Sequence, residues 1–361
     1  MRTRCLRRGL LVGAVLAVIL TTTAGAAGNA YVVHNLVSDQ PGIADHTDPL
    51  LVNAWGLGAL PTSPWWVADN ETNVSTIYGA DGATRRPPVN VDSAPTGLVA
   101  NTTPSFAVSM GGASGTALFI FDTEEGKILG WSPSVAPNDA VVAADLSGED
   151  AVFKGLAIAS TAGGDFLYAT DFHNGRVDVF DGSFGQVRMP GAFTDRHIPS
   201  DYAPFGIQTI GGHVFVTYAK QGEGDDELHG QGLGFVDEYT PAGALVRRVA
   251  THGQLNAPWG LAAAPASFGA LGGDLLIGNF GDGRINAYAQ AADGSYERQD
   301  ALRGADHRPL AIDGLWALQF GHGAANNGPT DTLFFTAGPD DESHGLFGTI
   351  RASAFAYAAF L

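Results

Sequence analysis

Short apolar runs recur along the chain, and glycine-rich turns bound each of them. A short motif stands before each run. It consists of a small residue or proline, then any residue, then glycine, then leucine or isoleucine. The copies are separated by 41 to 58 residues, and this period is typical of a repeat protein. The anchor positions are Gly56, Gly97, Gly155, Gly206, Gly260 and, with alanine in the glycine place, Ala317.

An apolar strand is expected after each anchor, followed by a turn and an alternating strand such as 175–181 or 283–288. Period-two alternation bounded by Asn-Gly and Asp-Gly turns predicts hairpins, and no segment keeps a 3.6-residue apolar period over three turns. The pattern predicts an all-β, six-bladed β-propeller with four-stranded blades. The alternative is a pair of β-sandwiches, which would not need one motif six times. The expected second strands are 65–69, 117–122, 166–171, 213–218, 274–279 and 332–337.

The two ends of the repeat region should complete one blade. Residues 31–37 read as a strand before the first anchor, and 346–350 end the last repeat. An open sheet edge invites unwanted pairing, so we expect the N- and C-terminal strands to close the ring. We expect a single propeller over residues 31–351, with a short tail at 352–361. The repeated glycine is explained by crowding, because inner strands meet near the axis.

The first 26 residues predict a signal peptide. Four arginines precede an apolar run at 10–20, and small residues follow, which suits cleavage after Ala26 or Ala30. The run is too short to span a bilayer, so we expect a secreted or periplasmic protein without a membrane span. General secretory and twin-arginine export both fit. Cys5, the single cysteine, would leave with this segment, so no disulfide is expected.

Longer motifs resemble an uncharacterised bacterial family of exported β-propeller proteins. The matching segments are 36–39, 48–56, 203–206, 278–283, 314–318 and 344–348. Some members of that family carry a PEP-CTERM sorting tail, which this chain lacks at its Ala-Phe-Leu end. More distantly, the blades are similar to NHL-type repeats. That wider group includes binding modules and lactone hydrolases, so the resemblance implies an exported propeller and no particular reaction.

Polar residues end most of the expected second strands. In a propeller such ends converge on the axial funnel, where carboxylate and amide oxygens could surround a hard cation. The candidate calcium ligands are Asp69, Asp171, Asn279, Asp282 and Asp340, and the further funnel candidates are His173, Tyr218 and His344. The alternative is that each Asp or Asn caps a tight turn by bonding to the backbone. The tryptophans beside the anchors, Trp55, Trp259 and Trp316, are expected to be core residues.

Composition narrows the function classes. The net charge of −18 argues against a nucleic-acid partner, because nothing would neutralise phosphates. The chain has no Gly-x-Ser-x-Gly elbow, Walker loop or His-Glu-x-x-His motif. We expect a monomeric binding or scaffold module for a small molecule or a protein. The alternative is a calcium-dependent, lactonase-like hydrolase. A quinone-dependent dehydrogenase would also suit a propeller, but no residue pattern favours it.

Overall fold

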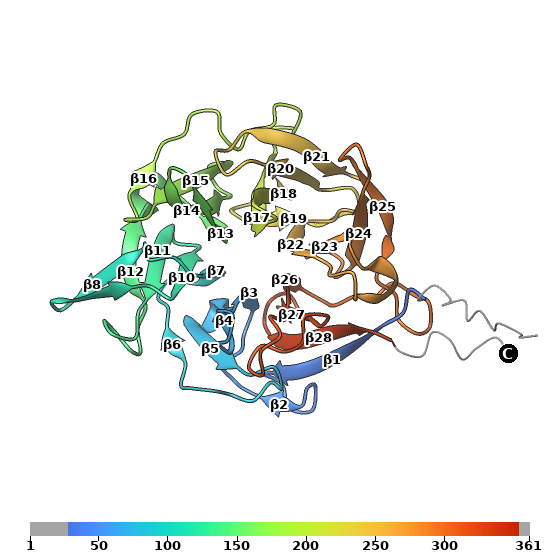
Figure 1. The fold of residues 1–361 in the computed structure, drawn as a ribbon, viewed down its shortest axis with the longest axis horizontal. Helices are drawn as coiled ribbons and strands as arrows, with labels where there is room; N and C mark the ends of the chain where they lie inside the picture. The colour runs from blue at the N-terminus through green and yellow to red at the C-terminus, as the bar shows by residue number, and fades with distance from the viewer. Residues whose placement is uncertain (1–27, 354–361) are drawn as a thin grey trace, which may run out of the picture.

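The computed structural model describes residues 28–353, and six β-sheets stand around a common axis like the blades of a propeller (Figure 1). This confirms the predicted all-β, six-bladed architecture. The predicted signal peptide and most of the predicted tail lie outside the described residues. Within 28–353 no helix is long and apolar enough to cross a membrane. The helical segments are the 3-10 turns η1 (Asn70–Thr72), η2 (Ser147–Glu149) and η3 (Gly269–Leu271).

Each blade runs outward from an inner strand that carries an anchor. Blade one is β3 (Ala54–Gly58), β4 (Trp65–Asp69), β5 (Val74–Tyr78) and β6 (Val89–Asn90). Blade two is β7 (Pro95–Ala100), β10 (Phe119–Thr123), β11 (Lys127–Trp131) and β12 (Val141–Asp145). Blade three is β13 (Phe153–Thr161), β14 (Gly164–Asp171), β15 (Arg176–Asp181) and β16 (Gln186–Val187).

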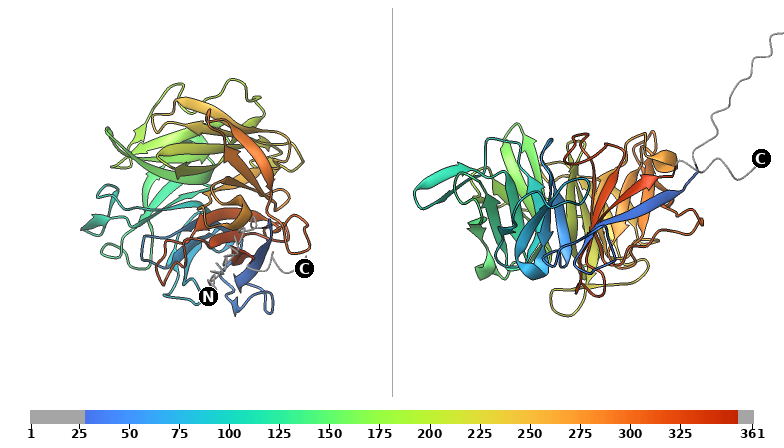
Figure 2. Two further views of the ribbon diagram at one scale, coloured as in Figure 1. Left: turned by 45° about the vertical axis from the view of Figure 1, so that its right-hand side comes forward. Right: turned by 90° about the horizontal axis from the view of Figure 1, so that it is seen from below.

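The other three blades repeat this order. Blade four is β17 (Tyr202–Ile210), β18 (His213–Gln221), β20 (Phe235–Tyr239) and β21 (Leu245–Thr251), with β19 (Glu227–Leu228) beside β18. Blade five is β22 (Pro258–Ala263), β23 (Leu275–Asn279), β24 (Ile285–Gln290) and β25 (Tyr296–Ala301). Blade six is β26 (Leu315–Phe320), β27 (Leu333–Ala337) and β28 (Leu346–Ala352), completed by β1 (Tyr31–Ser38) and β2 (His46–Thr47). A separate hairpin, β8 (Ala107–Met110) and β9 (Ala113–Thr116), projects from blade two (Figures 1 and 2).

The closing blade joins the two ends of the propeller. Strand β1 pairs antiparallel with β28, so that Tyr31 lies opposite Ala352 and Ser38 opposite Leu346. At the outer end of this pair the amide of Ser353 donates a 2.8 Å hydrogen bond to the carbonyl of Ala30. The predicted closure by N- and C-terminal strands is therefore confirmed.

The anchor glycines lie where neighbouring inner strands touch. A Cβ atom on Gly56 would be 2.5 Å from the carbonyl oxygen of Thr96, and one on Gly260 would be 2.5 Å from that of Trp316. Gly206 meets the backbone of Trp259 in the same way. These neighbours are backbone atoms of strands held in ladders, so they have little freedom to move aside. The crowding that the repeated glycine predicted is present.

Candidate functional site

The six residues that precede the anchors meet at the axis. Trp316 stacks on Trp55 with 3.8 Å between ring centroids, although the two come from the last and first blades. Phe205 of blade four lies 5.9 Å from Trp316, and Trp259 of blade five lies 6.5 Å from Trp55. Side chains of non-adjacent blades touch in this way only around a shared axis. The six positions are Trp55, Thr96, Lys154, Phe205, Trp259 and Trp316.

Lys154 is the charged member of this axial ring. Its ammonium lies 5.3 Å from the centroid of Trp55 and donates a 2.6 Å hydrogen bond to Glu124. The side chain is 4% exposed, and burial alone would lower its pKa. The nearby carboxylates of Glu124, Glu227 and Glu342 outweigh burial and raise the Lys154 pKa above its ordinary value. The ring therefore contains a permanently protonated amine.

An amide and carboxylate network covers Lys154 at this end of the axis. The indole of Trp316 donates to Asn53 at 2.9 Å, and the amide of Asn53 donates to Glu342 at 2.6 Å. Burial raises the pKa of Glu342 to about 7; Glu227 adds to this effect, while Lys154 and Asn53 oppose it. A carboxyl group with such a pKa can take up or release a proton near neutral pH, as a general acid or base must.

The predicted funnel residues mostly bind within their own blades. Buried Asp69 accepts the backbone N–H of Thr76 at 2.8 Å, and burial raises its pKa well above the usual range. Asp171 accepts the backbone N–H groups of Val152 and Asn174, and burial raises its pKa to about 6. These bonds are those of the turn-capping alternative.

The remaining Asn, Asp and Tyr candidates also bond to residues of their own blades. Asn279 donates to Asp282 at 3.0 Å, so these two predicted ligands are brought together. The hydroxyl of Tyr218 bonds that of Tyr239 at 2.7 Å, and the backbone N–H of Asp340 donates to Asp313 at 2.9 Å.

The two histidines pair with aspartates. His173 lies 2.6 Å from Asp225, and His344 lies 2.7 Å from Asp39. His173 and Tyr218 line one groove of about 400 Å³. Over residues 28–353 no group of three or more His, Cys, Asp or Glu side chains is placed to hold a metal ion. Calcium binding by the five predicted residues stays a prediction.

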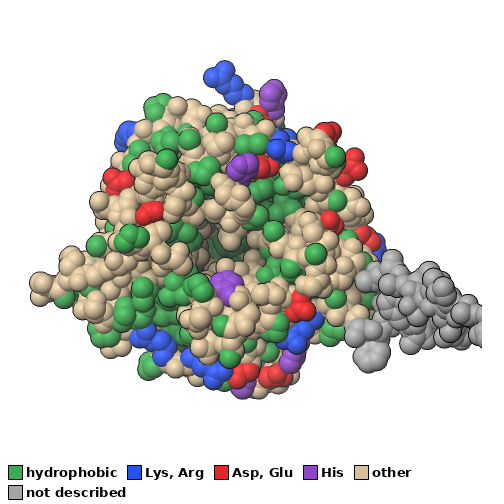
Figure 3. Space-filling model, viewed as in Figure 1, with side chains coloured by type: hydrophobic (Ala, Val, Ile, Leu, Met, Phe, Trp, Pro, Cys, Tyr) green, Lys and Arg blue, Asp and Glu red, His purple; other side chains and the backbone are tan. Residues whose placement is uncertain are grey.

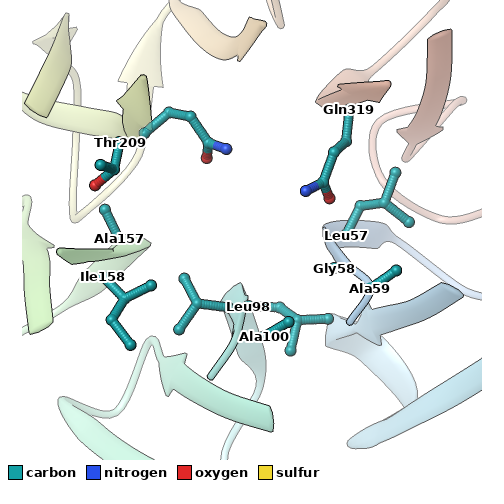
Figure 4. Close-up of a pocket in the computed structure, with 11 residues that line it drawn as sticks. Leu57, Gly58, Ala59, Leu98, Ala100, Ala157, Ile158, Thr209 and Gln319 are labelled. Atoms are coloured by element: carbon teal, nitrogen blue, oxygen red, sulfur yellow. The ribbon is translucent and has the colours of Figure 1, made fainter. Parts of the chain in front are cut away.

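The opposite end of the axis is open. Figure 3 shows a hollow at the centre of the ring, and Figure 4 shows the side chains around it. The cavity measures about 130 Å³ and is formed where the inner strands end. A second cavity of about 20 Å³ shares Leu57, Leu98, Gln208 and Gln319 with it and reaches Trp259. We call the two together the axial channel. The upper cavity is lined by Leu57, Gly58, Ala59, Leu98, Val99, Ala100, Ala157, Ile158, Gln208, Thr209 and Gln319.

Three of the residues that line the channel have polar side chains, and the others are apolar residues or glycine. Gln208 and Thr209 come from β17, and Gln319 comes from β26. The side-chain oxygens of Thr209 and Gln319 are buried and have no hydrogen-bond partner within the described part of the chain. None of the residues that line the channel carries a charge.

Sequence reasoning missed both the lysine cluster and the channel. Lys154 does leave a signal, because it is one of three lysines and occupies a position that is aromatic in four of the six repeats. Glu124, Glu227 and Glu342 leave none, because they lie outside the repeated strands of the blades and share no spacing. The residues that line the upper cavity follow the anchors by one to three positions, on or at the end of the inner strands.

No protein-family model matches the chain. An uncharacterised protein of Acanthamoeba polyphaga mimivirus is 34% identical over 331 residues, which cover 88% of this chain and 79% of the viral protein. A second uncharacterised protein of that virus is 31% identical over 334 residues, covering 88% and 85%. The chain belongs to the family of these viral proteins. Both viral proteins are uncharacterised, so the relationship supplies no reaction.

Several solved structures resemble this chain, but only in their fold. A protein of unknown function from Bacteroides thetaiotaomicron has a TM-score of 0.57 at 11% identity, covering 89% of this chain and 76% of that one. A glucose dehydrogenase has a TM-score of 0.52 at 13% identity, covering 90% and 99%. A luciferin-regenerating enzyme has a TM-score of 0.51 at 12% identity, covering 90% and 96%. These names differ too widely to indicate one function.

Proposed function

We propose that the protein is an extracytoplasmic binding module and that its small-molecule site is the axial channel. The observation that carries the proposal is a preformed channel at the centre of the ring, lined by uncharged side chains that include Gln208, Thr209 and Gln319. Ligand sites in proteins are concave and mostly apolar, with a few placed polar groups. The extracytoplasmic location rests on the predicted signal peptide and on the resemblance to exported bacterial propellers.

The ring favours binding without rearrangement. The channel walls are inner strands of different blades, and their backbones touch at the anchor glycines. A rigid wall orders few groups when a ligand enters, which lowers the entropic cost of binding. A volume of about 130 Å³ is close to that of an engineered apolar cavity, about 150 Å³, that takes up benzene. The expected ligand therefore has the size of a single ring.

Ligand-observed NMR with a library of single-ring compounds tests this function. Ala100 lines the mouth and is half-buried, so Ala100→Phe should obstruct entry and abolish the signal of any channel ligand. The matched control is Ala107→Phe on the exposed surface of β8. Binding that survives Ala100→Phe, or a library without any ligand, would contradict the channel as the site.

A hydrolase is the second candidate, and the cluster around Lys154 favours it. A buried ammonium and a carboxyl group that titrates near neutral pH could stabilise an oxyanion and transfer a proton. The predicted lactonase-like activity would use this end of the axis, with calcium as its metal. Hydrolysis of γ-butyrolactone with calcium, after chelation, and by Glu342→Gln tests it. Equal rates for the parent and for Glu342→Gln would exclude a catalytic role for Glu342.

A further inference from the structure

We propose that the axial channel selects an uncharged ligand that combines an apolar body with one group able both to donate and to accept hydrogen bonds, such as a carboxamide. This inference rests on the proposed function and names the ligand class for the same site. It follows from how polar, apolar and charged groups are distributed over the channel wall.

The polar groups of the wall gather on two blades. Figure 4 shows the side chain of Gln319 of blade six extending toward the open space, and Thr209 of blade four lies on the other side of it. The side-chain oxygens of Thr209 and Gln319 make no hydrogen bond to another residue in the described range, and Gln208 lines both cavities. A glutamine amide offers two donors and an acceptor, and a threonine hydroxyl offers one donor and acceptor capacity. This part of the wall can therefore both donate hydrogen bonds to a ligand and accept them from it.

The apolar groups lie on the other blades. Leu57, Leu98 and Ile158 come from blades one, two and three, and Figure 4 shows their side chains around the lower half of the opening. Below them, Trp259 and Leu261 line the narrow cavity. A ligand that fits both halves must be apolar on one side and hydrogen-bonding on the other.

The absence of charge from the channel wall excludes ions as ligands. The protein carries a net charge of −18, yet no ionisable side chain lines either cavity. A charged ligand would lose its water shell without gaining a counter-ion, which is strongly unfavourable in an apolar enclosure. An amide ligand exchanges its hydrogen bonds to water for bonds to Gln319, Gln208 and Thr209.

Four probes of nearly equal shape test the inference. Benzamide is neutral and hydrogen-bonding, α-methylstyrene is neutral and apolar, benzoate is an anion, and benzamidine is a cation. Dissociation constants at pH 7 should be at least tenfold lower for benzamide than for the other three. Gln319→Leu should reduce the affinity for benzamide to that for α-methylstyrene, and Thr209→Val should reduce it in part. The control Gln299→Leu changes an exposed amide outside the channel. Thermal melting confirms that each variant is folded.

The outcomes separate this inference from the proposed function. Equal binding of α-methylstyrene and benzamide, both blocked by Ala100→Phe, would overturn the inference and leave the channel as a binding site. Tighter binding of benzoate or benzamidine would overturn it in the same way. If no probe and no library compound enters the channel, the inference and the proposed function both fail. If benzamide binds selectively but Gln319→Leu does not weaken its binding, the role assigned to the side-chain amide of Gln319 is also overturned.

Discussion

The hydroxyl of Thr336 on β27 donates a 2.5 Å hydrogen bond to the carbonyl oxygen of Trp55 on β3, and so a side chain of the last blade binds the backbone of the first. Thr336 also accepts the backbone N–H of Ala317 in its own blade at 3.1 Å. Thr170 makes the equivalent bond from blade three to the carbonyl of Phe205 in blade four, at 2.6 Å. Buried threonines thus join neighbouring blades where the anchor glycines let them approach.

Thr336→Val should lower the free energy of unfolding by about 1–3 kcal/mol, because the carbonyl of Trp55 and the amide of Ala317 would both lose a buried partner. Urea unfolding measures the change. Thr62→Val is the control, since this threonine is exposed. Equal midpoints for both variants would show that the bond across the ring closure contributes nothing.

Gly260→Ala should destabilise the protein by about 1–3 kcal/mol, since the added methyl group would overlap the backbone of Trp316 in a packed region. Gly148→Ala is the matched control, because a Cβ atom there meets no atom within 4 Å. Thermal melting of the two variants compares crowded and open glycines directly. If both variants have the melting temperature of the parent, the anchor glycines are not crowded.

Stability should fall as the pH rises from about 5 to 7. Burial raises the pKa of Glu342 to about 7, that of Asp122 to about 7 and that of Asp171 to about 6. The folded state therefore keeps protons that the unfolded state releases above about pH 4, and the stability that these protons supply is lost as they dissociate.

Glu342→Gln removes one of these titrations, so its unfolding free energy should depend less on pH over the same range, by up to about 1.4 kcal/mol per pH unit. Glu297→Gln on the exposed face of β25 is the control. A parent whose stability rises between pH 5 and 7 would contradict the prediction.

The calcium hypothesis predicts a melting temperature that is several degrees higher with calcium than after chelation. Magnesium serves as the comparison. The shift should be lost in Asp171→Asn and Asp282→Asn, which remove one charge each from two predicted ligands. Identical melting of the parent under all three conditions would contradict calcium binding and leave the binding module as the simpler account.

The start of the mature chain has a predicted effect on stability. The side chain of Asn29 donates 2.9 Å hydrogen bonds to Asp300 and to the carbonyl of Ala301, which ties this residue to blade five. A protein that starts at Ala27 should therefore be more stable than one that starts at Tyr31. Intact mass of the exported protein identifies the cleavage position, and melting of the two forms measures the difference. An exported form that retains Cys5 would contradict the signal peptide.

Local patterns explain why the fold was predictable and the site was not. The anchor glycines recur from one repeat to the next, and so do polar strand ends such as Asp69. Comparing the sequence with itself therefore identifies the blades. The same aspartates were expected to meet at the axis. The structure shows that Asp69 and Asp171 instead accept backbone N–H groups within their own blades.

The lysine cluster depends on contacts that have no local signature. Glu124, Lys154 and Glu342 belong to three blades and are separated by long stretches of chain, and the bond between Glu124 and Lys154 exists only in the closed ring. Gln319 and Thr209 are likewise ordinary polar residues in sequence. Their meaning comes from the closed ring, which places both residues on the wall of the axial channel.

The meeting of Ala30 and Ser353 has a practical consequence for how the protein can be handled. Ala30 directly precedes β1 and Ser353 directly follows β28, at the rim of the ring where these strands begin and end (Figure 1). The axial channel opens at the centre of the ring (Figure 3). A tether attached before Ala30 or after Ser353 would leave the molecule from the same spot on its rim. Both attachment positions thus lie at the rim of the ring, away from the axial channel.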